Sequence, residues 1–265
     1  MSSNRRSFLK VAGITAALGL GGSLSLQAGN YKPEITEHKE SEDQLEAKRW
    51  GMVIDTRKFK TPEDFQRVIE ACHSVHNVPE SIPDEKQEIK WIWKDEFHHV
   101  FPSHENPFLA DRLEHQEFIL LCNQCNNPPC VRVCPTQATF QRPDGIVMMD
   151  FHRCIGCRYC MAGCPFGSRS FNFRDPAPFL KETNEKFPTR TRGVVEKCNF
   201  CAERLAFGEM PACVEASQGA IIFGDLEDPD SEIRKVLREN FTIRRKVDLG
   251  PSPSVFYIGY GANML

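Results

Sequence analysis

Two cysteine runs stand almost back to back between residues 122 and 165, and their spacing limits what the chain can fold around. The first run reads C-x2-C-x4-C-x3-C-P and the second reads C-x2-C-x2-C-x3-C-P. Their cysteines are Cys122, Cys125, Cys130 and Cys134, then Cys154, Cys157, Cys160 and Cys164. The second spacing is that of bacterial ferredoxins, in which three thiolates hold one [4Fe–4S] cluster and the fourth reaches a second cluster. The pair of runs therefore predicts iron–sulfur ligation.

Zinc and disulfides are the competing interpretations of these cysteines. Zinc sites also use C-x2-C pairs, but four cysteines this close together, beside a near copy, exceed what one tetrahedral zinc requires. Disulfides are favoured in oxidising compartments. A disulfide framework, however, does not account for repeated x2 spacing that ends in Cys-Pro.

An incomplete run precedes this pair. A strand-like stretch after Gly51 ends in the same Asp-x2-basic pattern that precedes Cys154, and Phe59 stands at the ligand position. The run keeps its fourth cysteine, Cys72. The ferredoxin spacing, counted back from Cys72, falls on residues that cannot ligate iron: Pro62, Phe65 and Val68.

A second incomplete run follows the pair. It holds Cys198, Cys201 and Cys213, with Ser217 where the fourth cysteine is expected. Residues 51–140 therefore resemble residues 145–223, which makes the chain a tandem repeat with four ligand runs.

Counting ligands distinguishes two ways of pairing the four runs, because runs exchange their fourth cysteines in pairs. If neighbouring runs pair, Cys72 completes the cluster of the Cys122 run, and Cys134 is left without a cluster. The set of Cys154, Cys157 and Cys160 then has only Ser217 as its fourth ligand. If the inner two and the outer two pair, all twelve cysteines form three complete sets. These sets are Cys122, Cys125, Cys130 and Cys164; Cys154, Cys157, Cys160 and Cys134; and Cys198, Cys201, Cys213 and Cys72.

We prefer the second pairing, because the loss of one whole site explains both incomplete runs. Two alternatives stay open at its margins. Cys72 could be a buried structural thiol, and Ser217 could be an unusual oxygen ligand.

The N-terminus reads Asn4-Arg5-Arg6-Ser7-Phe8-Leu9-Lys10 before a mildly apolar stretch, Val11 to Leu26. The Arg5-Arg6 pattern is similar to a twin-arginine export signal; a basic N-terminus before a core helix is the alternative. Cleavage after Ala28 or retention as an anchor are both open. Removing the segment would change the formal charge from −3 to −6, so we expect an acidic protein with local basic docking patches and no nucleic-acid partner.

The rest of the chain carries weaker signals. Thr61 caps a helix expected to end near His73, with Pro62 in its first turn. Other expected elements are strands at Ile89–Lys94, Ala138–Phe140 and Ala220–Phe223, a helix from Ser231 to about Glu239, and an edge strand or partner contact at Val255–Tyr260. The histidines of residues 80–117 have no haem attachment motif and read as ordinary loop residues: His98, His99, His104 and His115.

The four runs resemble those of the iron–sulfur subunits of the polysulfide and dimethyl sulfoxide reductase group and of NrfC. The resemblance covers residues 49–258, and within the group it is greatest to the DsrO family, the exported ferredoxin-like subunits of the Dsr membrane complex. The stretches that carry the resemblance are Lys197 to Arg204, Pro211 to Ala216, His152 to Met161, Ser170 to Pro176, Phe187 to Gly193 and Gly224 to Pro229. Four-cluster members have cysteines between the positions of Phe59 and Val68 and at Ser217.

The resemblance implies an α+β fold of tandem bacterial ferredoxin-like domains, with an inserted loop and strand region and a C-terminal extension. The expected division is a signal segment at 1–28, an arm at 29–48, an outer ferredoxin-like half at 49–79 plus 195–224 with one cluster site lost, an insertion at 80–117, an inner half at 118–174, a Pro-rich loop at 175–194 and a partner-docking extension at 225–265.

No sequence pattern supplies a catalytic site, so we expect an electron-transfer subunit with three [4Fe–4S] clusters. The resemblance implies a periplasmic location and membrane association through partners: an NrfD-like integral membrane quinone-interacting subunit and a multihaem cytochrome c, in a complex of sulfur metabolism. One alternative is the electron-transfer subunit of a molybdopterin oxidoreductase such as polysulfide or dimethyl sulfoxide reductase. Another is a structural metal-binding protein without a redox role.

Overall fold

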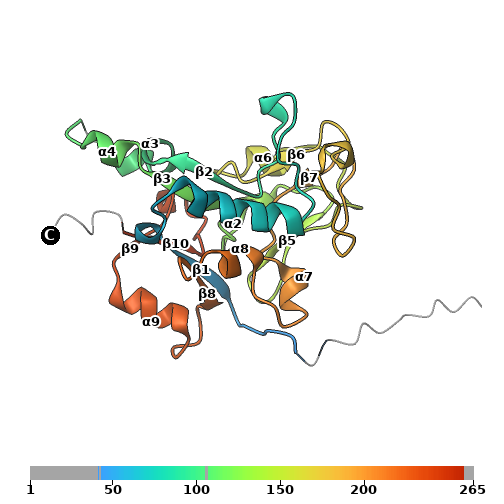
Figure 1. The fold of residues 1–265 in the computed structure, drawn as a ribbon. Helices are drawn as coiled ribbons and strands as arrows, with labels where there is room; N and C mark the ends of the chain where they lie inside the picture. Colours follow the sequence, from blue (N-terminus) through green and yellow to red (C-terminus); the bar gives the residue numbers. More distant parts are fainter. Residues whose placement is uncertain (1–40, 42, 105–106, 260–265) are drawn as a thin grey trace, which may run out of the picture. The chain divides into compact units, whose positions relative to one another are not determined.

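The computed structural model describes residues 41, 43–104 and 107–259. The predicted export signal at 1–28, including Arg5 and Arg6, lies outside the described residues, as do most of the arm and the last six residues of the chain. The helices are α2 (Pro62–Val75), α3 (Phe97–Val100), α4 (Asp111–Glu114), α5 (Pro129–Arg132), α6 (Tyr159–Ala162), α7 (Ala202–Leu205), α8 (Ala212–Ala216) and α9 (Glu232–Glu239). The strands are β1 (Trp50–Asp55), β2 (Ile92–Glu96), β3 (Glu117–Leu121), β4 (Thr139–Gln141), β5 (Val147–Met149), β6 (Ser170–Phe171), β7 (Val195–Glu196), β8 (Ile221–Asp225), β9 (Thr242–Ile243) and β10 (Val255–Ile258). Helices and strands are thus mixed, as in the α+β class (Figure 1).

A four-stranded sheet in the order β8-β1-β10-β9 forms one side of the core. Its strand β1 is buried along its whole length and pairs antiparallel with β8 and parallel with β10. The prediction of an edge strand at Val255–Tyr260 was wrong, because β10 lies between β1 and β9. Val255 and Tyr257 are both buried, and the Tyr257 hydroxyl donates to the Ile119 carbonyl at 3.1 Å. An apolar run that is buried in this way is a core strand.

Helix α2 confirms the predicted helix and extends it by two residues, to Val75. Thr61 is its N-cap, and the backbone N–H of Thr61 donates to the Asp64 carboxylate at 3.0 Å. Phe65, Val68 and Cys72 are the buried residues of α2, at helical spacing. The helix packs against α8 of the last ligand run (Figure 1).

In the described part of the chain, three two-stranded antiparallel sheets accompany the four-stranded sheet: β2–β3, β4–β5 and β6–β7. Strands β4 and β8 confirm the predicted strands that follow two of the ligand runs, each displaced by one residue at its start. The strand predicted at Ile89–Lys94 begins only at Ile92. The chain before Ile92 is held by side chains instead, since the Lys90 N–H donates to the Ser170 hydroxyl and the Trp91 indole N–H donates to Glu196.

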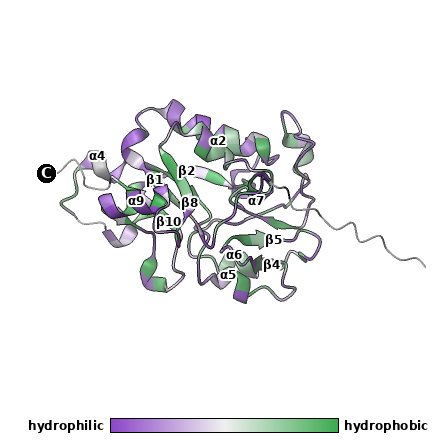
Figure 2. Cartoon of the chain, turned by 90° about the horizontal axis from the view of Figure 1, so that it is seen from below, coloured by the Kyte–Doolittle hydropathy of each residue, from purple (hydrophilic) through white to green (hydrophobic). Residues whose placement is uncertain are grey.

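Apolar side chains from the sheet, α2 and β3 form one continuous core, and cysteines belong to it. Figure 2 shows hydrophobic residues along strands such as β5 and both hydrophobic and hydrophilic residues along α2. Among the described residues, no helix has the length and apolar character needed to cross a membrane.

Candidate iron–sulfur centres

None of the twelve cysteines forms a disulfide in the structure, and their exposure to solvent differs. Most are buried, three are half-buried, and Cys157 alone is exposed. The thiols fall into groups drawn from distant segments.

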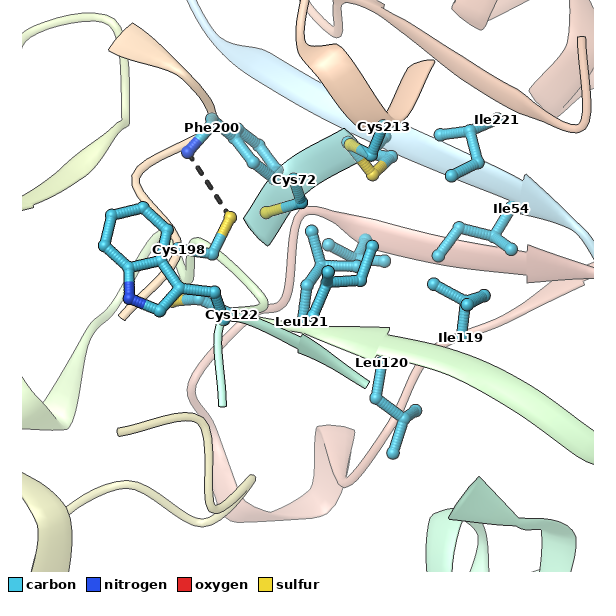
Figure 3. Close-up of a cluster of buried hydrophobic side chains, with 14 of the residues drawn as sticks. Ile54, Cys72, Ile119, Leu120, Leu121, Cys122, Cys198, Phe200, Cys213 and Ile221 are labelled. Atoms are coloured by element: carbon cyan, nitrogen blue, oxygen red, sulfur yellow. Dashed lines mark hydrogen bonds between the residues drawn. The ribbon is translucent and has the colours of Figure 1, made fainter. Parts of the chain in front are cut away.

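The outer group consists of Cys72 on α2 and the three cysteines of the last ligand run, Cys198, Cys201 and Cys213. Burial raises the pKa of Cys72 well above its usual value, and the nearby thiols of Cys198, Cys201 and Cys213 raise this pKa further. Figure 3 shows Cys72, Cys198 and Cys213 gathered in the same part of the core, from separate segments. The helical spacing of α2 explains the position of Cys72, which lies on the buried face one turn beyond Val68.

The turn that carries Cys198 and Cys201 is bent so that the backbone N–H of Phe200 points to the Cys198 sulfur. Phe200 and Cys201 both have left-handed backbone conformations, with φ of 55° and 52°. The Phe200 N–H donates to the Cys198 sulfur at 3.5 Å, and the Cys201 N–H donates to the Asn199 side chain at 2.9 Å. Donors of this kind stabilise negative charge on a thiolate.

The middle group consists of Cys122, Cys125 and Cys130 from the first complete run and Cys164 from the end of the second. Burial raises the pKa of Cys125, and the thiols of Cys122, Cys130 and Cys164 raise this pKa further. Cys122 follows directly after the last residue of β3. The Gln124 side chain ties this loop to its neighbours, because it donates to the Cys198 carbonyl at 3.0 Å and accepts from the Val147 N–H at 2.8 Å.

The remaining group surrounds α6. Burial raises the pKa of Cys160; Arg169 opposes the change, and Cys130 and Cys154 contribute to it. Burial also acts to raise the pKa of Cys134, but hydrogen bonds from the Thr139 N–H and the Thr136 side chain outweigh burial and lower this pKa.

The structure thus brings Cys154 and Cys160 together, and it places Cys134 just after α5, which packs against α6. Cys157 lies in the exposed loop before α6. Gly156 in this loop has φ of 69°, and a Cβ there would collide with the Gly193 carbonyl oxygen, so the turn requires glycine.

The groups follow one another in a fixed order. Cys160, of the α6 group, packs in one buried cluster with Cys130 of the middle group. Cys198, of the outer group, belongs to another buried cluster together with Cys122 of the middle group; burial raises the pKa of Cys198 to about 12, and Cys122 raises this pKa further. The middle group therefore lies between the other two.

These donor sets fit iron–sulfur clusters. Burial raises the pKa of Cys213 to about 12 and that of Cys201 well above its usual value, so the thiolates would be costly without a neighbouring cation. A coordinating metal reverses this balance and deprotonates the thiol outright. Buried cysteines at ferredoxin spacing therefore offer the thiolate ligands that iron–sulfur clusters require, and the iron supplies the positive charge that buried thiolates need.

The predicted lost site contains no thiol. Phe65 and Val68 belong to the apolar core, and the rings of Phe59 and Phe65 pack 5.0 Å apart. The Ser217 hydroxyl donates to the Val214 carbonyl at 2.7 Å and accepts from the Ile221 N–H at 3.0 Å. Local hydrogen bonds thus occupy Ser217.

Sequence reasoning missed two buried cations beside the thiols. Arg169 is buried; burial alone would lower its pKa, but interactions with Cys130, Cys160 and Cys122 raise this pKa overall. Lys197 is also buried and donates to the carbonyls of Val147 and Cys198. In the sequence, Arg169 and Lys197 are recognisable only as basic residues close to a ligand run. Many surface residues fit the same description.

A buried histidine was missed as well. The His76 ring lies between Cys72 and α7: Nδ1 is 2.7 Å from the Cys72 carbonyl oxygen and Nε2 is 2.7 Å from Glu203. The histidines of the insertion behave differently. His98 and His99 lie on α3 and not in a loop, and the rings of His98, His99 and His115 lie 2.8–3.5 Å from the carboxylates of Asp95 and Glu96.

Comparison with known proteins gives consistent matches. The model of a 4Fe–4S dicluster domain matches residues 114–176. The Hdr-like menaquinol oxidoreductase iron-sulfur subunit 1 of Archaeoglobus fulgidus is 40% identical, over 97% of this chain and 98% of the relative. A subunit of tetrathionate reductase from Salmonella typhimurium is 35% identical over 98% and 89%, and protein NrfC of Escherichia coli is 31% identical over 98% and 97%.

Proposed function

Since this chain belongs to the family of iron–sulfur electron-transfer subunits that includes NrfC and the menaquinol oxidoreductase subunit, we propose that it carries three [4Fe–4S] clusters and relays single electrons between a membrane quinone-reactive subunit and a periplasmic redox partner. The proposed membrane partner is an NrfD-like protein, and the proposed periplasmic partner is a multihaem cytochrome c. The proposed setting is a complex of sulfur metabolism of the Dsr type. Both partners rest on family resemblance.

We assign the clusters to the three complete cysteine sets. The first is Cys122, Cys125, Cys130 and Cys164; the second is Cys154, Cys157, Cys160 and Cys134; the third is Cys198, Cys201, Cys213 and Cys72. The observation that carries this assignment is the position of Cys72, whose thiol neighbours are the cysteines of the last run. A tandem ferredoxin arrangement in which inner runs pair and outer runs pair accounts for that position.

Clusters held in this way accept and release one electron at a time. The protein's own part is to exclude water and to offset charge. The outer thiols lie in the apolar core, and backbone N–H groups donate to the Cys198 and Cys134 sulfurs. Buried Arg169 and Lys197 add positive charge beside the sets. Hydrogen bonds to sulfur, net charge and exposure set cluster potentials, so these residues tune the relay.

Cys72→Ser tests the assignment. We expect the purified wild type to hold about twelve irons per chain, because three cubanes of four irons fill the three sets. Cys72→Ser should lose about four irons when its cluster is lost entirely, or about one when a three-iron cluster remains. Iron and acid-labile sulfide analysis gives the count; sixteen irons in the wild type would overturn the three-cluster proposal.

Electron paramagnetic resonance identifies which cluster is lost. Cys72→Ser and Cys213→Ser should leave the same residual spectrum after reduction, because both remove a ligand from the outer set. Cys125→Ser should leave a different one. A residual spectrum of Cys72→Ser that matches Cys125→Ser would show that neighbouring runs pair.

A second candidate is the electron-transfer subunit of a molybdopterin oxidoreductase. The identity of 35% with the tetrathionate reductase protein over nearly the whole chain favours it. Purification of the native complex separates the two: bound haem supports the Dsr-type assembly, and stoichiometric molybdenum supports the alternative.

We also propose export by the twin-arginine route, on the basis of Arg5 and Arg6 in the sequence. Replacement of both by lysine should retain the protein in the cytoplasm, as cell fractionation would show. Secretion of that variant at the wild-type level would refute the proposal.

A further inference from the structure

A group of exposed apolar side chains surrounds the loop that carries the exposed Cys157. Ile155 is 66% exposed and Tyr159 is 62% exposed, within two residues of Cys157 on either side. Val133, at 39%, continues the surface from the neighbouring run. It lies against Gly163, because a Cβ at Gly163 would be 3.1 Å from Val133 and 3.3 Å from the Tyr159 carbonyl oxygen.

Arginines surround these apolar side chains. Arg132, Arg153 and Arg158 are exposed, and the Arg158 guanidinium lies 5.8 Å from the ring centre of half-exposed Phe173, which extends the surface. Within the described residues, Arg153 is the only one of the three in an ion pair, with Asp150 at 3.2 Å. The face is therefore positive, although the whole chain has a formal charge of −3.

This face lies at the α6 group, and the place of that group in the order of cysteine groups indicates the role of the face. The α6 group, which packs against the middle group through Cys160 and Cys130, is at one end of the order, and it contains the one exposed cysteine. The outer group, at the other end, is buried. An electron leaves most readily where a partner can approach a cluster closely, so the exposed end is the natural port.

We infer that this docking face, made of Arg132, Val133, Arg153, Ile155, Arg158 and Tyr159, receives a redox protein whose cofactor edge is apolar and ringed by carboxylates. The inference rests on the proposed electron-transfer function. Charge complementarity selects the occupant: a positive rim on a negative chain attracts an acidic partner and repels a basic one. A small apolar centre with a charged rim suits the brief encounters of electron-transfer proteins.

Stopped-flow oxidation of the full, cluster-loaded chain tests this inference. The reduced protein is mixed with a small acidic cytochrome c, and separately with the basic mitochondrial cytochrome c, over a range of salt concentrations. The second-order rate with the acidic cytochrome should be the larger at low salt and should fall as salt rises. The Arg132→Glu/Arg153→Glu variant should lower that rate by about tenfold or more at low salt.

Matched controls separate the port from the relay. Lys235→Glu/Arg238→Glu on α9 makes the same change of net charge at exposed positions outside the ligand runs and should leave the rate near the wild-type value. Oxidation by a small neutral quinone should be equal in all variants, with unchanged iron content. An equal loss in both charge variants, or no loss in the docking-face variant, would overturn the inference. A wild-type chain without iron, or one that no oxidant discharges, would overturn the proposed function and the inference with it.

Discussion

Glu196 on β7 is the residue whose removal should most damage the fold around the proposed clusters. Its carboxylate is fully buried and accepts three hydrogen bonds: from Arg190 at 2.6 Å, from the Trp91 indole at 2.6 Å and from Asn172 at 2.5 Å. Arg190, also fully buried, donates to the carbonyl of Asn77 at 2.8 Å as well. The Glu196 carboxylate thus connects the insertion, the Pro-rich loop and the paired strands β6 and β7 next to Cys198.

Glu196→Ala would leave the Arg190 guanidinium buried without a countercharge. Breaking a buried ion pair from one side costs about 3–5 kcal/mol. Glu196→Gln keeps the shape and part of the hydrogen bonding, so its cost should be smaller, about 1.5–3 kcal/mol for hydrogen bonds to a charged group. Glu88→Ala is the matched control: its ion pair with Lys90 at 3.4 Å is half exposed, and such surface pairs contribute about 1 kcal/mol or less.

The assay is the rate at which guanidinium bleaches the visible absorbance of the anaerobic protein, since cluster loss makes unfolding irreversible. If the cost of Glu196→Ala falls mainly on the unfolding rate, bleaching should accelerate by about a hundredfold or more. Glu196→Gln should fall between Glu196→Ala and the control. Bleaching of Glu196→Ala within about threefold of Glu88→Ala would refute the reasoning, because the network would then contribute no more than a surface pair.

Two further substitutions test the core and the lost site. Ser217→Cys should add no fourth cluster, because Phe65 and Val68 fill the site with apolar side chains; iron analysis should give the wild-type count, and a gain of about four irons would contradict this. Tyr257→Phe removes one buried hydrogen bond to Ile119 and should destabilise the fold by about 1 kcal/mol, seen as a modest rise in the bleaching rate with unchanged iron content.

The ligand loops and α2 could be predicted from the sequence because their signals are local. Thr61 and Pro62 mark a helix start whatever lies around them, and a cysteine spacing states which sulfurs one loop can supply. The starts of β4 and β8 differ from the predicted starts by only one residue for the same reason.

The position of β10 and the burial of Arg190 could not be predicted, because both depend on distant residues. Whether Val255–Ile258 is an edge or a central strand is decided by its pairing with β1, about two hundred positions earlier in the chain. Arg190 stands in a charged, Pro-rich stretch that reads as an exposed connector. Only the buried partner Glu196, on strand β7 that follows, makes it an interior residue.

The order of the cysteine groups explains how the proposed relay of three clusters would work without the fourth site of the family pattern. Cys122 and Cys198 belong to the same buried cluster, so the middle and outer groups are neighbours. The lost positions lie on the elements of the outer group, since Val68 is one helical turn from Cys72 and Ser217 follows the helix of Cys213. The loss is therefore terminal and leaves no gap in the proposed path. Phe65 and Val68 instead belong to the apolar core, where burying such a side chain stabilises the fold by about 1.5–3 kcal/mol relative to leaving it exposed. A ligand set lost from the middle group would instead separate the exposed port from the outer cluster.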